Sequence, residues 1–302
     1  MKKIDAHTHV FDYIKGYGGK GELQAIGNGK ARWATGEVVS MIPEGFGDKS
    51  FTGDTLVSIL KENDVERAIL LQGSFYGFQN EYTYEVARKY PDIFLAAGTL
   101  DPFCKEADKI LERLLHEFQF PIIKFETSSG GGLMGFHEDY IIDQRFDGIF
   151  DIIAREGRTL VLDIGSPGMK SFQPEAVARV ARKYPEMHII VCHLLAPTIN
   201  DSETLEKALM ILNIENVWFD LAAVPWNVAP EKYPYPTGQH FIQMASEIVG
   251  YEKLLWGTDV PSVLTKESYN NLSNYIIQSD IFTEKQLEAV FYSNALKAYP
   301  FE

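Results

Sequence analysis

The sequence predicts an α/β fold, a single (β/α)₈ TIM barrel, and three observations lead to it. Eight short apolar runs alternate with helical patterns along the chain, an order that requires a parallel sheet. The runs are almost continuously apolar, as expected for strands buried on both faces. The length of 302 residues suits such a barrel as one domain, residues 1–302. A doubly wound open sheet is the alternative, but no G-x-G-x-x-G motif follows the first strand.

The elements of the barrel follow in order from apolar periodicity and from helix-ending residues. The strands are predicted at Ile4–Val10, Arg67–Gln72, Phe94–Thr99, Ile122–Glu126, Thr159–Ile164, His188–Cys192, Val217–Leu221 and Leu254–Gly257. The helices are predicted at Asp54–Asn63, Asn80–Tyr90, Lys105–Glu117, Asp147–Glu156, Pro174–Tyr184, Asp201–Leu212, Gly238–Val249, Tyr269–Ser279 and Glu284–Ala298. Pro91 ends the second helix because proline cannot continue a helix. The last two helices would close the outer ring.

A long interval, Phe11–Thr52, separates the first strand from the first helix. It is rich in glycine and shows no regular apolar period, which predicts a loop. A loop of this length inside a compact domain is usually functional. The aromatic residues Tyr13, Tyr17, Trp33 and Phe46 favour a packed lid over the barrel.

Composition limits the partners and the compartment. The net charge of −14 excludes nucleic acid and anionic membrane as expected partners, because both require a basic surface, and leaves a small-molecule substrate. The two cysteines, Cys104 and Cys192, lack C-x-x-C spacing, so a disulfide framework is not expected. The N-terminus has no apolar stretch behind Lys2 and Lys3, and no run is long enough to span a membrane. We therefore predict a cytoplasmic protein.

The first strand, IDAHTHV, places Asp5, His7 and His9 on one face, with neighbours about 6.5–7 Å apart. Imidazole is a common ligand of zinc, iron and manganese. Asp259 follows the last strand, which neighbours the first in a closed barrel, and a carboxylate there can bind a metal or take a proton from water. We predict a metal site of His7, His9 and Asp259. The alternatives are hydrogen-bonded core histidines and a turn aspartate before Pro261.

Nearly every predicted strand ends in a polar residue, and active sites of these barrels lie at the carboxyl ends of the strands. Besides the three predicted metal ligands, these residues are Gln72, Asp101, Lys124, Glu126, Asp163, His193 and Asp220. His137, in the loop after the fourth strand, is a further candidate. This rim is the predicted active site.

Two of these residues have several possible roles. His193 could polarise a carbonyl or carry a proton, or it could be a hydrogen-bonded core histidine. Lys124 could bind a substrate carboxylate, carry a carbamate between two metals, or form an internal ion pair with Glu126 or Asp163.

The segment Ala222–Thr237 contains Trp226, Tyr233 and Tyr235 together with four prolines. It could wall a substrate pocket or pack at the interface of a homo-oligomer, and the sequence does not separate these two interpretations.

Several of these segments together resemble the amidohydrolase superfamily, in its amidohydrolase-related branch. That branch includes aminocarboxymuconate-semialdehyde decarboxylase, resorcylate decarboxylases, pyrone-dicarboxylate lactonase and sugar lactonases. The opening IDAHTHVFD resembles the family's first signature, YPEMHIIVCHLLAP its sixth strand, ENVWFDLA its seventh, LLWGTDVP its eighth and SNALKAY its closing helix. The resemblance covers nearly the whole chain.

This resemblance implies that His7, His9 and Asp259 bind one divalent ion, with zinc the expected one, and that His193 is catalytic. Metal-dependent members carry a further histidine ligand after strand five, where this chain has Asp163. Aspartate also binds zinc, at about 2.0–2.2 Å. The lactonase side of the family lacks that histidine too, and some of its members work without metal. Residues 70–94 also look more like the lactonases.

We therefore expect a hydrolase that opens a lactone, or a similar cyclic ester or amide, of a small carboxylate-bearing substrate. Asp259 would act as general base, His193 would stabilise the oxyanion, and Lys124, Asp163 and Trp226 would contact the substrate. A metal-dependent decarboxylase of an aromatic or muconate-type acid is the second hypothesis. The third, of another class, is a barrel without catalytic activity that acts as a binding protein.

Overall fold

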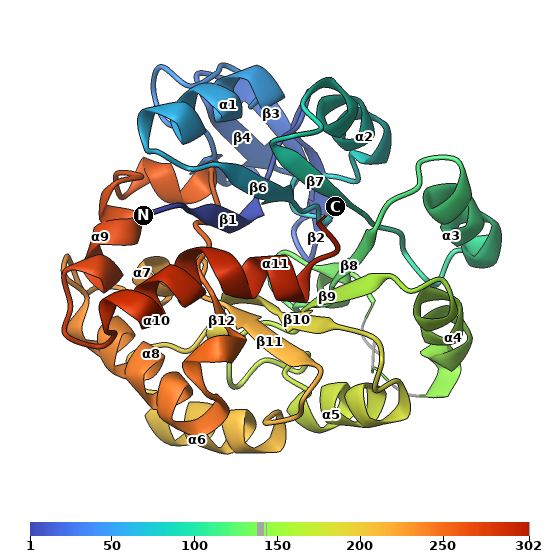
Figure 1. The fold of residues 1–302 in the computed structure, drawn as a ribbon. Coiled ribbons are helices and arrows are strands. Elements are labelled where there is room, and N and C mark those ends of the chain that lie inside the picture. Colours follow the sequence, from blue (N-terminus) through green and yellow to red (C-terminus); the bar gives the residue numbers. More distant parts are fainter. Residues whose placement is uncertain (138–141, 143, 302) are drawn as a thin grey trace.

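The computed structural model describes residues 1–137, 142 and 144–301, and it confirms the predicted barrel (Figure 1). Within these residues eight parallel strands pair in chain order. They are β1 (Ile4–Thr8), β6 (Arg67–Leu70), β7 (Phe94–Gly98), β8 (Ile122–Glu126), β9 (Thr159–Asp163), β10 (Ile189–Val191), β11 (Val217–Asp220) and β12 (Leu254–Leu255). Most are shorter than predicted, because the last residues of each apolar run already turn away from the sheet.

The barrel closes between its last and first strands. A parallel bridge joins Thr8 to Val260, just beyond β12. The backbone N–H of Asp259 donates to the carbonyl oxygen of His7 at 2.8 Å, and that of His9 donates to Val260 at 2.9 Å. The closure therefore brings the H-x-H segment and Asp259 side by side, although some 250 residues separate them in sequence.

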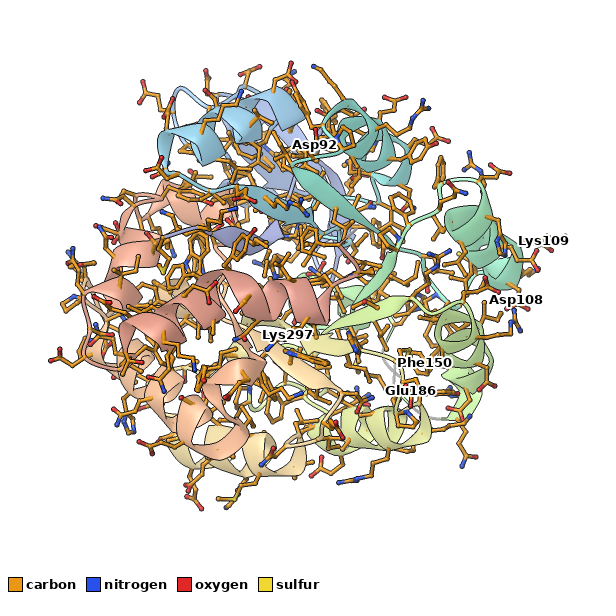
Figure 2. All side chains as sticks on the ribbon, in the orientation of Figure 1. Asp92, Asp108, Lys109, Phe150, Glu186 and Lys297 are labelled. Carbon is orange, nitrogen blue, oxygen red and sulfur yellow. The ribbon has the colours of Figure 1, made fainter. Side chains whose placement is uncertain are left out.

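The helices pack around the barrel, and their charged side chains, such as Asp108 and Lys109 of α3, project from the outer surface (Figure 2). In the described part of the chain the α-helices are α1 (Gly53–Glu62), α2 (Asn80–Lys89), α3 (Ala107–His116), α4 (Asp147–Arg155), α5 (Pro174–Lys183), α6 (Ser202–Ile211), α7 (Val224–Asn227), α8 (Pro236–Val249), α9 (Asn271–Ile277), α10 (Glu284–Glu288) and α11 (Asn294–Ala298). The last predicted helix is divided into α10, the π-helix η6 (Ala289–Ser293) and α11. Short 3-10 turns are η1 (Leu133–Gly135), η2 (Gln144–Phe146), η3 (Cys192–Leu195), η4 (Tyr251–Lys253) and η5 (Ser262–Thr265).

The prediction of a loop at Phe11–Thr52 was wrong. Residues 15–40, all of them described, form an antiparallel sheet of β2 (Lys15–Gly18), β3 (Gly21–Gly27), β4 (Lys30–Trp33) and β5 (Val38–Ser40), paired in that order. Buried and exposed residues alternate along β2, β3 and β4, a period of two that small side chains obscure in the sequence. The interval does cover one side of the barrel mouth, as a lid would, but it is an ordered sheet.

The amino end of the barrel is closed by the C-terminal helix. In Figure 1, α11 lies across the centre of the barrel. The carbonyl oxygen of Ala298 accepts a hydrogen bond from His188, just before β10, and Tyr299 packs against the apolar residues inside the barrel. With that end covered, the carboxyl end is the open one. Among the described residues, no helix is both long enough and apolar enough to cross a lipid bilayer.

Candidate active site

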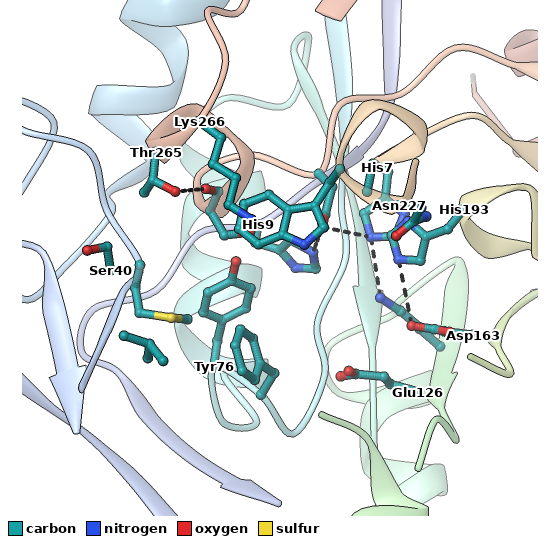
Figure 3. Close-up of a pocket in the computed structure, with 18 residues that line it drawn as sticks. His7, His9, Ser40, Tyr76, Glu126, Asp163, His193, Asn227, Thr265 and Lys266 are labelled. Carbon is teal, nitrogen blue, oxygen red and sulfur yellow. Dashed lines mark hydrogen bonds and ion pairs between the residues drawn. The ribbon is translucent and has the colours of Figure 1, made fainter. Parts of the chain in front are cut away.

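A cavity of about 460 Å³ lies at the carboxyl ends of the barrel strands (Figure 3). The residues to which the sequence gave a catalytic, substrate-binding or metal-binding role all line it: His7, His9, Lys124, Asp163, His193, Trp226 and Asp259. They come from β1 and the residue that follows it, from β8 and β9, and from the segments after β10, β11 and β12. The structure thus brings the candidate residues together, and their individual roles stay predictions.

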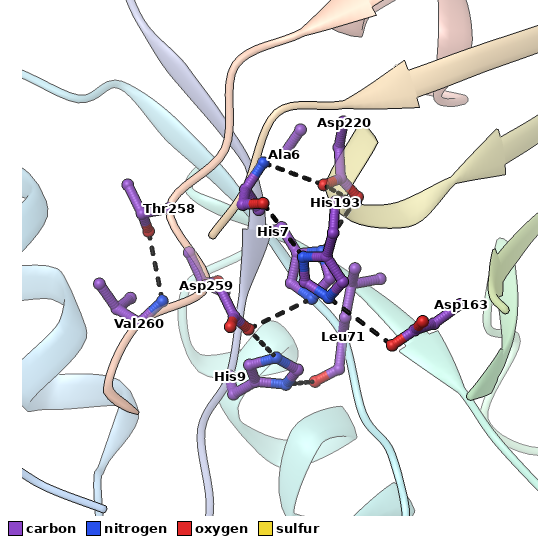
Figure 4. A network of polar contacts seen from close by, with 12 residues as sticks. Ala6, His7, His9, Leu71, Asp163, His193, Asp220, Thr258, Asp259 and Val260 are labelled. Carbon is purple, nitrogen blue, oxygen red and sulfur yellow. Dashed lines mark hydrogen bonds and ion pairs between the residues drawn. The ribbon is translucent and has the colours of Figure 1, made fainter. Parts of the chain in front are cut away.

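His7 is fully buried and held by Asp220 (Figure 4). Its Nδ1 lies 3.0 Å from Asp220 Oδ2, and because a carboxylate only accepts, Nδ1 carries the proton. Burial lowers the pKa of His7 to about 4, more than the nearby Asp220 charge raises it. Burial opposes the ionisation of Asp220, but His7 outweighs it, so the pKa of Asp220 falls to about 2. The neutral ring therefore turns the lone pair of Nε2 into the cavity.

His9 presents its other nitrogen in the same way. Its Nδ1 lies 2.9 Å from the carbonyl oxygen of Leu71, which also only accepts, so Nδ1 is the protonated nitrogen. Burial also lowers the pKa of His9. Its Nε2 lies 3.0 Å from Asp259 Oδ1, and His7 Nε2 lies 3.6 Å from that same oxygen. Three hydrogen-bond acceptors, the Nε2 atoms of His7 and His9 and Oδ1 of Asp259, thus converge, and none of them carries a proton.

Such a cluster fits a cation. The ligand atoms of His7, His9 and Asp259 all lie within 4.8 Å of one another, and two imidazole nitrogens with one carboxylate form a donor set suited to a divalent metal such as zinc. The Asp220 contact to His7 is the outer hydrogen bond that metal-binding histidines usually make. The residues present therefore fit the implied ion.

A second group, His7, His193 and Asp220, is equally close. Both oxygens of Asp220 are already engaged, however. Oδ2 contacts His7, while Oδ1 accepts from the backbone N–H groups of His193 and Ala222 at 2.9 and 3.1 Å. Asp220, which the sequence analysis placed at a strand end without a role, therefore orients the two histidines and does not face the cavity.

His193 follows β10 in a left-handed turn, with φ of +60°, and Asp259 has φ of +70°. Non-glycine residues seldom adopt this conformation, and it is concentrated at functional sites. His193 Nδ1 lies 3.2 Å from the carbonyl oxygen of Ala222, and Nε2 lies 3.6 Å from Asp163 Oδ2. Burial opposes a charge on His193, but the carboxylates of Asp163, Asp259 and Asp220 outweigh it and raise its pKa. His193 thus holds a proton more firmly than an ordinary histidine.

Asp163 takes the place of the expected histidine ligand, but it has other contacts. One oxygen lies near His193, and the other accepts from the backbone N–H of Gly165 at 2.8 Å. Among the described residues, Asp163 belongs to neither group of potential metal ligands. Its position lets it act on His193.

Lys124 lies at the floor of the cavity, only 2% exposed, with Nζ 3.5 Å from His7 Nε2. Burial disfavours its charge, but Cys192 and the carboxylates of Glu126, Asp163 and Asp259 outweigh burial and raise its pKa. Lys124 is therefore a cation at neutral pH, beside the cluster of acceptors.

Some strand-end residues do not belong to the site. Gln72 is buried and bonded to Asn80 and to the carbonyl oxygen of Ala97, so its function is structural. Asp101 pairs with His137 at 2.7 Å, and neither lines the cavity. The idea that His137 could belong to the rim site was therefore wrong.

The structure adds lining residues that sequence reasoning missed, namely Met41, Tyr76, Asn227, Ser262 and Lys266. Trp226 lines the cavity as well, which favours the pocket-wall interpretation of its segment. Lys266 Nζ lies 3.4 Å from the centre of the Trp226 ring. The aromatic-rich stretch after β6 is the one sequence signal that could have indicated Tyr76.

A sequence model of the amidohydrolase family matches residues 4–301. The chain belongs to the amidohydrolase family. No curated protein matches the chain. Among solved structures, an amidohydrolase from Burkholderia multivorans with bound zinc is similar over 100% of both chains, with a TM-score of 0.74 and 14% identity. A probable 2-pyrone-4,6-dicarboxylic acid hydrolase from Acinetobacter baumannii, with citric acid bound, is also similar over 100% of both chains. Its TM-score is 0.70 and its sequence identity is 17%.

A 5-carboxyvanillate decarboxylase from Sphingomonas paucimobilis is similar over 82% of each chain, with a TM-score of 0.57 and 14% identity. Hydrolases and decarboxylases thus both occur among the structural neighbours of this chain. At these identities the likeness supports the barrel fold.

Proposed function

We propose that the protein is a hydrolase that opens a lactone, or a similar cyclic ester or amide, of a small carboxylate-bearing substrate. The observation that carries this proposal is the placement of Asp163 against His193, 3.6 Å from Nε2 and apart from the His7, His9 and Asp259 cluster. Ring opening releases an alkoxide or amide nitrogen, which needs a proton. A histidine with a raised pKa that faces the cavity is suited to supply one.

His7, His9 and Asp259 would hold the divalent ion, expected to be zinc, which would polarise a carbonyl and lower the pKa of a water molecule. Burial disfavours the ionised form of Asp259, but the neighbouring His9, His193 and His7 outweigh it and lower its pKa. Asp259 is therefore ionised at neutral pH and free to accept a proton from the attacking water.

The bond changes balance as follows. The water oxygen bonds to the carbonyl carbon and its proton goes to Asp259, the ring C–O or C–N bond breaks, and the leaving atom takes the proton of His193. Lys124, whose charge is buried beside His7, would hold the substrate carboxylate. The product is a ring-opened hydroxy or amino acid.

The test uses purified protein supplied with zinc and a panel of γ- and δ-lactones, cyclic amides and aromatic carboxylic acids. Acid release measures ring opening, and carbon dioxide release measures decarboxylation. We expect ring opening. Carbon dioxide from an aromatic acid without lactone turnover would instead support the decarboxylase, and no turnover of any compound would support a binding protein.

Replacing Asp259 by asparagine should lower kcat by about 10²–10⁴-fold, the usual size of a general-base effect. Circular dichroism and thermal unfolding should show a folded barrel. The control is Asp151→Asn, an exposed carboxylate on α4. Near-wild-type turnover by Asp259→Asn would contradict the assignment of the base.

A further inference from the structure

Two polar side chains in the cavity have no role in the proposed reaction. Glu126, at the end of β8, is partly buried and lines the cavity (Figure 3). Its environment consists of burial and of nearby charges, without a hydrogen bond from any described residue. This partly buried carboxylate lines the cavity, so it is open to a ligand.

The chain makes room for this carboxylate with two glycines. A Cβ atom on Gly73 would lie 1.7 Å from Glu126 Oε2, and a Cβ atom on Gly131 would lie 3.3 Å from Oε1. Neither glycine has a positive φ, so an alanine would be acceptable to the backbone at both positions. The missing side chains therefore provide space, and that space holds the Glu126 carboxylate at the cavity wall.

Asn227, on the short helix α7, offers the complementary group. Its Nδ2 is buried and has no hydrogen-bond partner among the described residues, although the side chain lines the cavity. Figure 3 draws Asn227 and His193 among the residues that line the cavity. A buried amide without a partner costs stability, and such groups are commonly completed by a ligand or a water molecule.

We propose that Glu126 determines the specificity of this site and that Asn227 positions the reacting carbonyl group. Glu126 accepts a hydrogen bond from a hydroxyl or ammonium group of the substrate, and Asn227 donates one to a substrate oxygen close to the reacting carbonyl. The proposal rests on the proposed hydrolase function, whose substrate it narrows. Burial raises the pKa of Glu126 to about 7, and an ammonium group bound beside it would favour its ionised form.

The charges in the cavity favour the same kind of substrate. Three carboxylates, Glu126, Asp163 and Asp259, line it against two lysines, Lys124 and Lys266. Lys124 and Glu126 lie two residues apart on one face of β8, about 7 Å from each other. A substrate with one carboxylate at Lys124 and a donor group at Glu126 is therefore accommodated. A second carboxylate at Glu126 would meet like charge.

The first experiment compares lactones that are identical except for one ring substituent, which is hydroxyl, ammonium, hydrogen or carboxylate. We expect the wild type to prefer the hydroxyl or the ammonium compound over the hydrogen compound by about 10- to 100-fold in kcat/KM, mostly through KM, and to disfavour the carboxylate. The better of the first two identifies the natural donor. The preference should shrink in Glu126→Gln and persist in Glu203→Gln, an exposed control.

Asn227→Ala should act differently, lowering kcat by about tenfold for every compound without changing their ranking. An unchanged ranking in Glu126→Gln would overturn the role of Glu126. A ranking altered by Asn227→Ala, or a kcat left intact, would overturn that of Asn227.

A second variant tests the same idea without removing the carboxylate. Gly73→Ala should displace Glu126 and reproduce the loss of preference expected for Glu126→Gln. The double variant Gly73→Ala/Glu126→Gln should lose no more than either single one. The control is Gly148→Ala on α4, where a new Cβ meets nothing within 4 Å. Additive losses, or a preference retained by Gly73→Ala, would overturn the proposal.

Calorimetric binding of the four compounds to Asp259→Asn separates this inference from the hydrolase proposal. If the wild type opens no lactone, the hydrolase proposal fails, while a binding preference for the donor-bearing compounds that disappears with Glu126→Gln still supports the specificity role. Equal binding of all four compounds, or none, would overturn it.

Discussion

His9 and His137 each lie against an aspartate at a similar distance, yet the two contacts are of different kinds. His9 Nε2 lies 3.0 Å from Asp259, and His137 Nε2 lies 2.7 Å from Asp101. The aspartates are almost equally exposed, at 19% and 18%. The histidines differ, because the His9 side chain is 6% exposed and that of His137 is 29% exposed.

The two contacts differ in what the other ring nitrogen, Nδ1, of the histidine does. The Nδ1 proton of His9 is donated to Leu71, so the neutral ring has no proton left for Asp259, and His7 brings another lone pair to the same oxygen. A metal cation satisfies that arrangement. His137 pairs with one carboxylate at the surface and, among the described residues, belongs to no group of three potential ligands. Converging acceptors therefore distinguish a site from a surface ion pair better than contact distance does.

The largest expected effect comes from breaking the His9 contact. His9→Ala removes one of three converging acceptors, so the protein should lose most of its bound metal. Its kcat/KM should fall by about 10²–10⁴-fold, because a bound metal stabilises the charge of the transition state by several kcal/mol. Metal analysis of the purified protein and lactone hydrolysis measure both losses. His137→Ala is the matched control. Full metal occupancy in His9→Ala would contradict the assignment of this cluster.

The residues of the central cluster could be predicted because the barrel topology determines where they meet. Alternation of apolar runs and helices indicates the fold, and the fold brings His7, His9, His193 and Asp259 to one rim. The sequence could not show that Asp101 turns toward His137 while Asp259 turns into the cavity. That depends on the backbone just after each strand, such as the left-handed φ of Asp259.

The small sheet shows another limit of the sequence. Asn28 and Gly29 connect β3 to β4, and Asn-Gly is a strong hairpin signal that a search for long apolar runs overlooks. The strands are short and their buried residues include alanine and glycine, so their period of two is weak in hydrophobicity. The lining contributed by Met41 could not be foreseen for the same reason.

A smaller effect is expected on the His193 side of the cavity. Asp163 is one of the carboxylates that raise the pKa of His193 over the opposing effect of burial, so Asp163→Asn should lower that pKa. If the protonated form of His193 is the active one, activity falls as the pH rises through its pKa. The alkaline limb of the kcat profile should therefore move to lower pH, with about a tenfold loss at neutral pH. An unmoved limb would argue against His193 as the proton donor.

The smallest effect is expected at the pair of His137 and Asp101, which should contribute to stability but not to activity. His137→Ala removes a partly exposed ion pair with Asp101 and ring contacts with Phe103 and Phe136, so the free energy of unfolding should fall by about 1 kcal/mol. Lactone turnover should stay within about twofold of wild type. Urea unfolding and steady-state kinetics on one preparation test both. A tenfold loss of turnover with normal stability would mean that a histidine–carboxylate pair outside the cavity also serves the reaction. Convergence of acceptors would then no longer distinguish the His9–Asp259 contact from the His137–Asp101 contact.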